Sequence, residues 1–181
     1  MSITLSPQTK IFKGEITLTS SKSESNRALI IQALCEGNFE IDNLSISDDT
    51  VVLQKLLNSS EKELNVKLAG TVMRFLTAFL AIKKEEVFLT GEPRMKQRPI
   101  KVLVDVLIGL GAEIEYLEKE GYPPIKITGK ELEGGKISID GSVSSQYISA
   151  MLMIAPKLKN GLQLEFKGEI ISKPYINMTI E

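Results

Sequence analysis

Apolar residues along the chain follow two different periods. Three stretches of about ten residues are apolar almost all the way round, at 28–35, 75–82 and 147–155. They are too short to span a membrane and too uniformly apolar for a surface helix, so each predicts a helix buried on every side. Each is followed by a stretch that alternates apolar with polar residues, at 39–44, 86–90 and 162–166. This alternation predicts half-buried strands.

A second helix is predicted after each of these strands, behind a polar link. The links are 47–50, 94–99 and 172–175, where Asp49 suits a helix cap and Pro99 suits an opening helical turn. A hairpin of strands at 112–116 and 125–128 follows the second unit, and a strand at 136–139 leads into the third. The first unit has only 61–68 in place of a hairpin, and the third ends within its second helix. The pattern therefore predicts an α/β fold (α+β) of repeated strand–helix units.

Short polar clusters open the three apolar helices. They lie at 20–27, 69–74 and 141–146, and each combines Ser, Thr or Gly with a strong polar group. The first N–H groups of a helix have no partner within the helix, and the helix start carries the positive end of its dipole. With hydroxyls and cations added, these starts predict anion-binding sites.

Composition narrows the class of protein. The 181 residues carry a formal net charge of -1, which argues against a general nucleic-acid or membrane-surface role. The single cysteine, Cys35, cannot form an internal disulfide and is expected to pack inside the first apolar helix. Histidine, the commonest acid–base group and metal ligand near neutral pH, does not occur. The start of the chain has no apolar signal segment, which predicts a cytoplasmic protein.

Six blocks of sequence resemble those of the 5-enolpyruvylshikimate-3-phosphate synthase family. The blocks are S-K-S-E-S-N-R-A-L (21–29), A-G-T-V-M-R-F-L (69–76), L-T-G-E-P-R-M-K-Q-R-P-I (89–100), G-Y-P-P (121–124), D-G-S-V-S-S-Q-Y (140–147) and S-K-P-Y-I (172–176). The resemblance implies βαβαββ repeats with buried helices and outer mixed sheets, in an inside-out, barrel-like domain. It divides the domain, 15–181, into repeats at about 15–68, 69–135 and an incomplete 136–181. Segment 1–14 would pack with the family's second domain.

The same resemblance implies a reaction. Family members transfer the enolpyruvyl group of phosphoenolpyruvate to the 5-hydroxyl of shikimate 3-phosphate and release phosphate, on the route to chorismate and the aromatic amino acids. They use no metal or organic cofactor. They are more than twice as long as this chain, and their main acid–base groups lie in the other half. The resemblance therefore implies a substrate-binding half that is inactive alone and has the second domain as its partner.

Motif by motif, the resemblance also implies the binding residues. Those for shikimate 3-phosphate are Lys22, Ser23, Arg27, Ser144, Ser145, Gln146, Ser172 and Tyr175. Those for phosphoenolpyruvate are Lys22, Gly70, Arg98 and Gln146, and Lys22, shared by both substrates, is the one catalytic candidate. Arginine suits a carboxylate because its planar fork makes two parallel hydrogen bonds, and glycine lets the backbone approach a phosphate closely.

Two other interpretations stay open. A related enolpyruvyl transferase that acts on a nucleotide sugar shares the fold, but its opening motif pairs Lys with Asn and it uses a loop cysteine, and this sequence has neither. A non-catalytic phosphate-ligand-binding or split-enzyme module would fit the length. Arg74, one turn into a buried helix, is interpreted as a structural charge. Leu68 stands where family members commonly carry a small polar residue, which bears on their response to glyphosate, a competitor at the phosphoenolpyruvate site.

Overall fold

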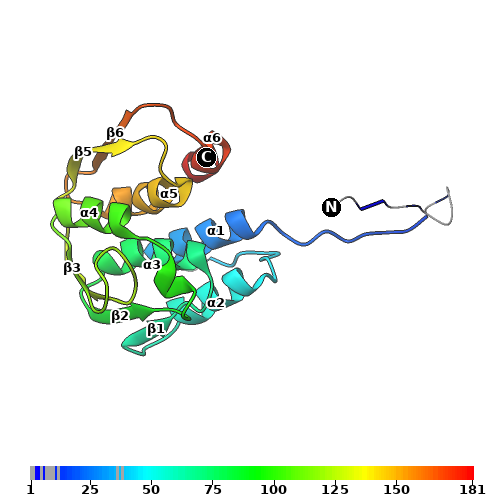
Figure 1. The fold of residues 1–181 in the computed structure, drawn as a ribbon, viewed down its shortest axis with the longest axis horizontal. Coiled ribbons are helices and arrows are strands. Elements are labelled where there is room, and N and C mark those ends of the chain that lie inside the picture. Colours follow the sequence, from blue (N-terminus) through cyan, green and yellow to red (C-terminus); the bar gives the residue numbers. More distant parts are fainter. Residues whose placement is uncertain (1–2, 5, 7–10, 12, 36, 38) are drawn as a thin grey trace.

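The structure is a computed structural model that describes residues 3–4, 6, 11, 13–35, 37 and 39–181. Six α-helices lie within this part of the chain, and Figure 1 shows their order. They are α1 (Lys22–Leu34), α2 (Asp48–Leu57), α3 (Gly70–Ala81), α4 (Lys101–Gly109), α5 (Ser145–Ile154) and α6 (Lys173–Ile180). Short 3-10 turns occur at Met95–Gln97 and Ala155–Lys157.

The strands form two separate sheets. They are β1 (Glu63–Asn65), β2 (Glu86–Thr90), β3 (Glu113–Tyr116), β4 (Ile125–Thr128), β5 (Gly135–Asp140) and β6 (Leu162–Lys167). The larger sheet has the order β1-β2-β4-β3, with β1 and β2 parallel and the other pairs antiparallel. β5 and β6 pair in parallel. The mixed α/β class and the predicted hairpin of β3 and β4 are confirmed, and the sheets do not close into a barrel.

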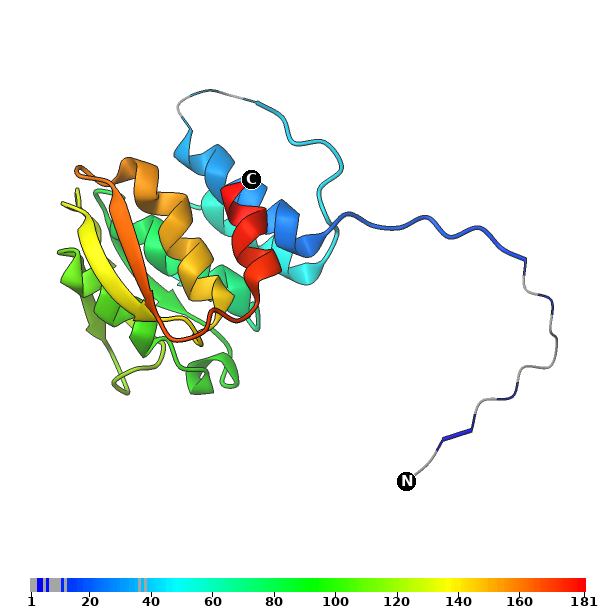
Figure 2. The same ribbon diagram turned by 90° about the horizontal axis from the view of Figure 1, so that it is seen from above.

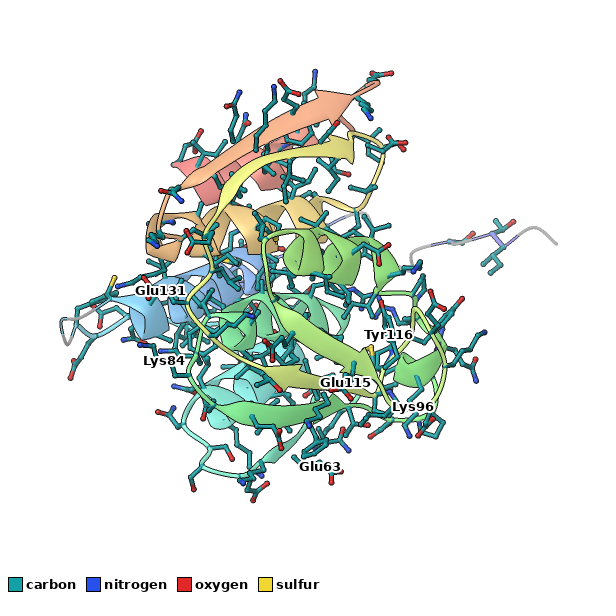
Figure 3. The ribbon with its side chains drawn as sticks, turned by 90° about the vertical axis from the view of Figure 1, so that its left-hand side faces the viewer. Glu63, Lys84, Lys96, Glu115, Tyr116 and Glu131 are labelled. Carbon is teal, nitrogen blue, oxygen red and sulfur yellow. The ribbon has the colours of Figure 1, made fainter. Side chains whose placement is uncertain are left out.

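Helices fill the interior and the sheets lie outside them. Every residue of α3 is buried except Thr71, and α3 packs against α1, α2, α4, α5 and the larger sheet. α5 is also largely buried. Figure 1 shows α3 and α5 between the β5–β6 pair and the strands of the larger sheet, and Figure 3 shows Glu63 and Glu115 on the outer side of the larger sheet. Both strand residues are exposed, so the alternating pattern places apolar side chains on the helices and charge on the surface.

The first repeat departs from the predicted pattern in two ways. Residues 39–44 form no strand, because the backbone turns at 42–43 and Asn43 has a left-handed φ of 57°. The second half of α1 is not buried on every side, since Ile31 is 41% exposed. Cys35 is exposed just beyond the end of α1, so its predicted packing in the core is wrong. α1 packs against α2, α3, α5 and α6, and its buried residues lie between Ser25 and Ile30, before its last turn.

The predicted role of segment 1–14 falls mostly outside the described residues. From 13 to 20 the chain extends away from the folded body as an arm, with Ile16 and Leu18 exposed (Figure 1). In the part of the chain that the structure describes, no helix has the length and apolar character to cross a membrane.

Candidate anion-binding site

Helices α1, α3 and α5 begin on the same side of the molecule, the side from which the arm departs (Figure 2). One hydrogen bond joins two of these starts. The side-chain amide of Gln146 donates to the hydroxyl oxygen of Thr71 at 3.1 Å. The predicted polar clusters of the second and third repeats therefore lie side by side, although 75 residues separate them in the sequence.

Gly70 and Arg98 are in direct contact at the start of α3. A Cβ atom placed on Gly70 would lie only 2.1 Å from Nη1 of Arg98, so a larger residue would push the guanidinium away. Arg98 itself is exposed. The absence of a side chain at Gly70 thus lets a solvent-facing guanidinium rest on the positive end of the helix, where both can act on one anion.

The start of α1 is capped and carries an ion pair. The Ser21 hydroxyl accepts a hydrogen bond from the backbone N–H of Glu24 at 3.3 Å. The ammonium of Lys22 lies 3.4 Å from a carboxylate oxygen of Asp49, in the first turn of α2. The expectation for Asp49 was a helix cap, whereas Ser47 holds the cap position and Asp49 pairs with Lys22.

Arg27 is buried and ties three helices together. Its guanidinium donates to the carbonyl of Ser23 and the hydroxyl of Ser149, both at 2.8 Å, to the carbonyl of Tyr175 at 3.0 Å, and to the hydroxyl of Thr179 at 2.7 Å. Burial lowers the pKa of Arg27. These bonds engage most of the five N–H donors of the side chain. A ligand carboxylate that binds Arg27 therefore has to replace some of them.

The serines of the third repeat lie at two neighbouring helix starts. Ser144 caps α5, since its hydroxyl accepts from the backbone N–H of Gln146 at 3.3 Å, and Ser145 is buried beside it. Ser172 precedes α6 with a left-handed φ of 56° and is exposed. The loop before it is joined to the loop before α5, because Ile171 N–H donates to the Gly141 carbonyl at 3.2 Å.

Tyr175 belongs to the Arg27 end of the site. Its carbonyl accepts from Arg27, and its side chain is 47% exposed. The predicted residues thus fall mainly into two groups. The first lies at the starts of α3 and α5 and contains Gly70, Arg98, Ser144, Ser145 and Gln146. The second lies between α1 and α6 and contains Ser23, Arg27, Ser172 and Tyr175. Lys22 points to a third start, that of α2.

Arg74 has the structural role that its position predicts. Its guanidinium donates to the carbonyl of Gly70 at 3.1 Å and to that of Pro99 at 2.8 Å, and its carbon Cζ lies 5.8 Å from the ring centre of Tyr147. The Tyr147 hydroxyl donates to the same Pro99 carbonyl at 2.8 Å. Burial lowers the pKa of Arg74. Because Pro99 directly follows Arg98, these bonds hold the backbone that carries the exposed guanidinium, a role that the sequence did not reveal.

Within the described ranges, no cluster of three or more His, Cys, Asp or Glu side chains is suited to hold an ion.

Comparison with known proteins identifies the class and then the family. The fold is a mixed α/β domain in which the polar starts of three helices lie on one side. A family model described as EPSP synthase (3-phosphoshikimate 1-carboxyvinyltransferase) matches residues 7–59 and 51–181. Because this match covers most of the chain, the protein belongs to the EPSP synthase family.

Individual relatives agree with the family model. The chain is 54% identical over 169 residues to the 3-phosphoshikimate 1-carboxyvinyltransferase of Bacteroides fragilis strain YCH46, a match covering 93% of this chain and 41% of the relative. It is 47% identical over 205 residues to the enzyme of the same name from Colwellia psychrerythraea, covering 99% of this chain and 48% of the relative. The chain thus spans less than half the length of these relatives.

The structure of EPSP synthase from Acinetobacter baumannii resembles the fold. The TM-score is 0.81 at 21% identity, and the match covers 94% of this chain and 44% of that chain. At this identity the likeness shows the fold alone.

Proposed function

We propose that this chain is the substrate-binding half of an enzyme that transfers the enolpyruvyl group of phosphoenolpyruvate to the 5-hydroxyl of shikimate 3-phosphate. The observation that carries the proposal is the contact between Gly70 and Arg98 at the start of α3, beside the start of α5. It combines an exposed cation with the start of a helix, whose first N–H groups have no partner within the helix. Both substrates carry a phosphate and a carboxylate, which such groups bind.

The proposed contacts to the two substrates draw on both groups of residues and share Lys22 and Gln146. Shikimate 3-phosphate is assigned to Lys22, Ser23, Arg27, Ser144, Ser145, Gln146, Ser172 and Tyr175. Phosphoenolpyruvate is assigned to Gly70, Arg98 and Gln146, with Lys22 shared. In the reaction the 5-hydroxyl oxygen adds to the enolpyruvyl carbon that bears the phosphate, while the methylene carbon gains a proton and the hydroxyl loses one. Loss of phosphate and of a methyl proton then restores the double bond. The chain's own part is positioning and charge neutralisation.

The acid–base groups of the reaction are assigned to the second half of the relatives' length. The predicted site contains no histidine, and the carboxylate nearest to Lys22 is engaged in an ion pair. Closure of a second domain over the substrates would exclude water and complete the set of charges. The chain alone is therefore expected to be inactive, with the second domain as its partner, in the cytoplasm and without nucleic acid.

Calorimetry with each substrate tests the proposed function. Shikimate 3-phosphate should bind the chain more tightly than phosphoenolpyruvate, because more of its proposed contacts lie in this half. Phosphate release should occur only when the second half is added in trans. Tighter binding of phosphoenolpyruvate would contradict the division of contacts. Substrate binding with no turnover after the second half is added would favour the alternative, a non-catalytic phosphate-ligand-binding module.

Substitution of Gly70 tests the observation itself. In Gly70→Ala the new methyl group would displace Arg98, and loss of a charge-assisted contact should weaken phosphoenolpyruvate binding about 10-fold or more, measured on the chain saturated with shikimate 3-phosphate. The matched control is Gly109→Ala, where an added Cβ meets nothing within 4 Å. If the two substitutions weakened binding equally, the Gly70–Arg98 contact would not contribute to phosphoenolpyruvate binding.

A further inference from the structure

Lys22 occupies an electrostatically unfavourable position. It is the first residue of α1, where the positive end of the helix dipole repels a cation. Its side chain is 47% exposed and is long enough to adopt many conformations. A lysine that must meet a substrate at one point therefore needs a partner that holds its ammonium.

Asp49 is placed to be that partner. Its carboxylate lies 3.4 Å from the Lys22 ammonium and is the less exposed member of the pair, at 24%. It belongs to the first turn of α2, where the helix dipole favours a negative charge. The negative charge of Asp49 is therefore favourable at this position, and the flexible Lys22 side chain adjusts to reach it.

Buried hydrogen bonds fix the start of α2 against α1. The Thr50 hydroxyl donates to the side-chain oxygen of Asn26 at 2.8 Å, and both residues are almost fully buried. The Ser47 and Thr50 hydroxyls are 3.0 Å apart. One residue away along the chain from Asn26, the Ser25 hydroxyl accepts from the Ser45 N–H at 2.9 Å. The position of Asp49 relative to α1 is therefore set by the fold and not by the ion pair.

A cleft runs from Asp49 to the residues that precede α3. Its volume is about 410 Å³, and Asp49, Leu68 and Ala69 are among the residues that line it. Ala69 directly precedes Gly70, which contacts Arg98. Asp49 therefore lies between the helix start that carries Lys22 and the one proposed to bind phosphoenolpyruvate.

We propose that Asp49 is a positioning residue, which holds the Lys22 ammonium between the two proposed substrate positions before either substrate binds. This inference rests on the proposed function, because it gives Asp49 a role only through Lys22. One N–H of the ammonium points to Asp49, and the other two are left for substrate oxygens. The side chain is then ordered by the protein and not by the ligand.

A double-mutant cycle on the chain separates positioning from simple charge. Asp49→Asn should weaken binding of shikimate 3-phosphate about threefold to tenfold, the factor expected when the ligand must order one long side chain. In Lys22→Met the same substitution should have no further effect. Asp48→Asn is the matched control, since it removes the same charge from the neighbouring, exposed residue of the same turn. It should leave the affinity unchanged or slightly raised.

Several results would overturn the proposal. The first is that Asp49→Asn binds shikimate 3-phosphate as tightly as the wild-type chain or more tightly. The second is that Asp48→Asn loses as much affinity as Asp49→Asn. The third is that Asp49→Asn causes the same loss of affinity when Lys22 is already methionine. Asp49→Glu, which keeps the charge but moves it by one methylene, should lose less affinity than Asp49→Asn. If Asp49→Asn does not fold, Asp49→Glu decides by the same comparison in the two Lys22 backgrounds.

Nuclear magnetic resonance of labelled lysine measures the mobility of the Lys22 side chain without any ligand. The Lys22 Cε group should be ordered in the wild-type chain and in Asp48→Asn, and mobile in Asp49→Asn. Absence of shikimate 3-phosphate binding by the wild-type chain would contradict the proposed function. If Lys22 were ordered in a chain that does not bind the ligand, the Lys22–Asp49 pair would be a structural ion pair, and Asp49 would have no positioning role. A Lys22 equally mobile in all three chains would end it too, even if the ligand binds.

Discussion

The carbonyl oxygen of Pro99 shows how single residues prepare the site. It accepts hydrogen bonds from Arg74 and from the Tyr147 hydroxyl, both at 2.8 Å, and so joins the interior of α3 to the first turn of α5. The residue before it carries the guanidinium that rests on Gly70. The buried side chains of Arg74 and Tyr147 thus fix the backbone next to the exposed Arg98, which would otherwise be held only by a loop.

Removal of the Arg74 guanidinium should be costly although it touches no proposed substrate. Arg74→Met keeps the apolar stem but loses the bonds to two carbonyls, so we expect the free energy of unfolding to fall by about 1.5–3 kcal/mol. Urea denaturation measures the change. Arg94→Met serves as the control, since Arg94 is exposed. Equal stability of the two variants would show that Arg74 is not a structural charge.

The sequence predicted some residues of the site better than others. Gly70 and Arg98 could be matched by motif, and the structure brings them into contact. The pairing of Lys22 with Asp49 could not be predicted from local pattern, because it depends on how the starts of two helices pack, 27 residues apart. An acidic residue near a helix start is usually a favourable charge for that helix alone.

At the scale of elements, the junction between α1 and α2 depends on a buried polar pair. Thr50→Val would keep the shape of the side chain but leave the Asn26 oxygen buried without its donor. We expect the free energy of unfolding to fall by about 1–3 kcal/mol, measured by urea denaturation. Thr77→Val is the control, because the equally buried Thr77 hydroxyl donates to the Met73 carbonyl within its own helix. A larger loss in Thr77→Val would refute this account.

The turn between β5 and α5 should make stability depend on pH. Asp140 accepts hydrogen bonds from the hydroxyl and the backbone N–H of Ser142, and these bonds lower its pKa. A carboxyl whose pKa is lower in the folded state stabilises the protein above its unfolded-state pKa, and this contribution is lost as the pH falls through the folded-state value.

Asp140→Asn should therefore lower the urea midpoint at neutral pH and have little effect in acid, below the ordinary carboxyl range. Asp42→Asn, in an exposed loop, makes the same change of charge and should shift the midpoint little at either pH. A difference between Asp140→Asn and wild type that persists unchanged in acid would argue against the carboxylate as its cause.

Elements with many packing partners were predicted best. α3 and α5 are buried as their uniform apolar character indicates, and the hairpin of β3 and β4 pairs as its alternation indicates. The error at 39–44 has a physical reason. Alternation records which side chains prefer burial, but a strand also needs a neighbour for its backbone, and here the chain turns at Asn43.

For the whole molecule, α3 is the element on which both halves of the fold depend. The larger sheet covers one side of it, and α5 packs along another. The buried apolar residues of α3 and of the larger sheet, and most of those of α5, form one continuous cluster. Arg27 adds bonds from α1 to Ser149 of α5 and Thr179 of α6. The third repeat therefore completes the core and does not merely extend it.

A fragment of residues 1–134, which lacks β5, α5, β6 and α6, should not keep the native packing. It would expose the flank of α3 that α5 covers and leave Arg27 without three of its partners. We expect retained helical circular dichroism, binding of an apolar dye, and loss of a cooperative thermal transition. Circular dichroism and dye fluorescence on the fragment and on the whole chain measure this. A sharp transition in the fragment would show that the first two repeats fold independently.

The burial of α3 also has a consequence for synthesis of the protein on the ribosome. α3 leaves the exit tunnel early, but α5, which covers its last apolar flank, is made more than 70 residues later. At about 5–20 residues per second, that interval lasts about 4–14 s. During this time a nascent chain exposes a nearly uninterrupted apolar segment to solvent. The same sequence feature that makes α3 the centre of the finished fold makes the unfinished chain a substrate for chaperones, with Phe75 and Phe79 inside the segment to be shielded.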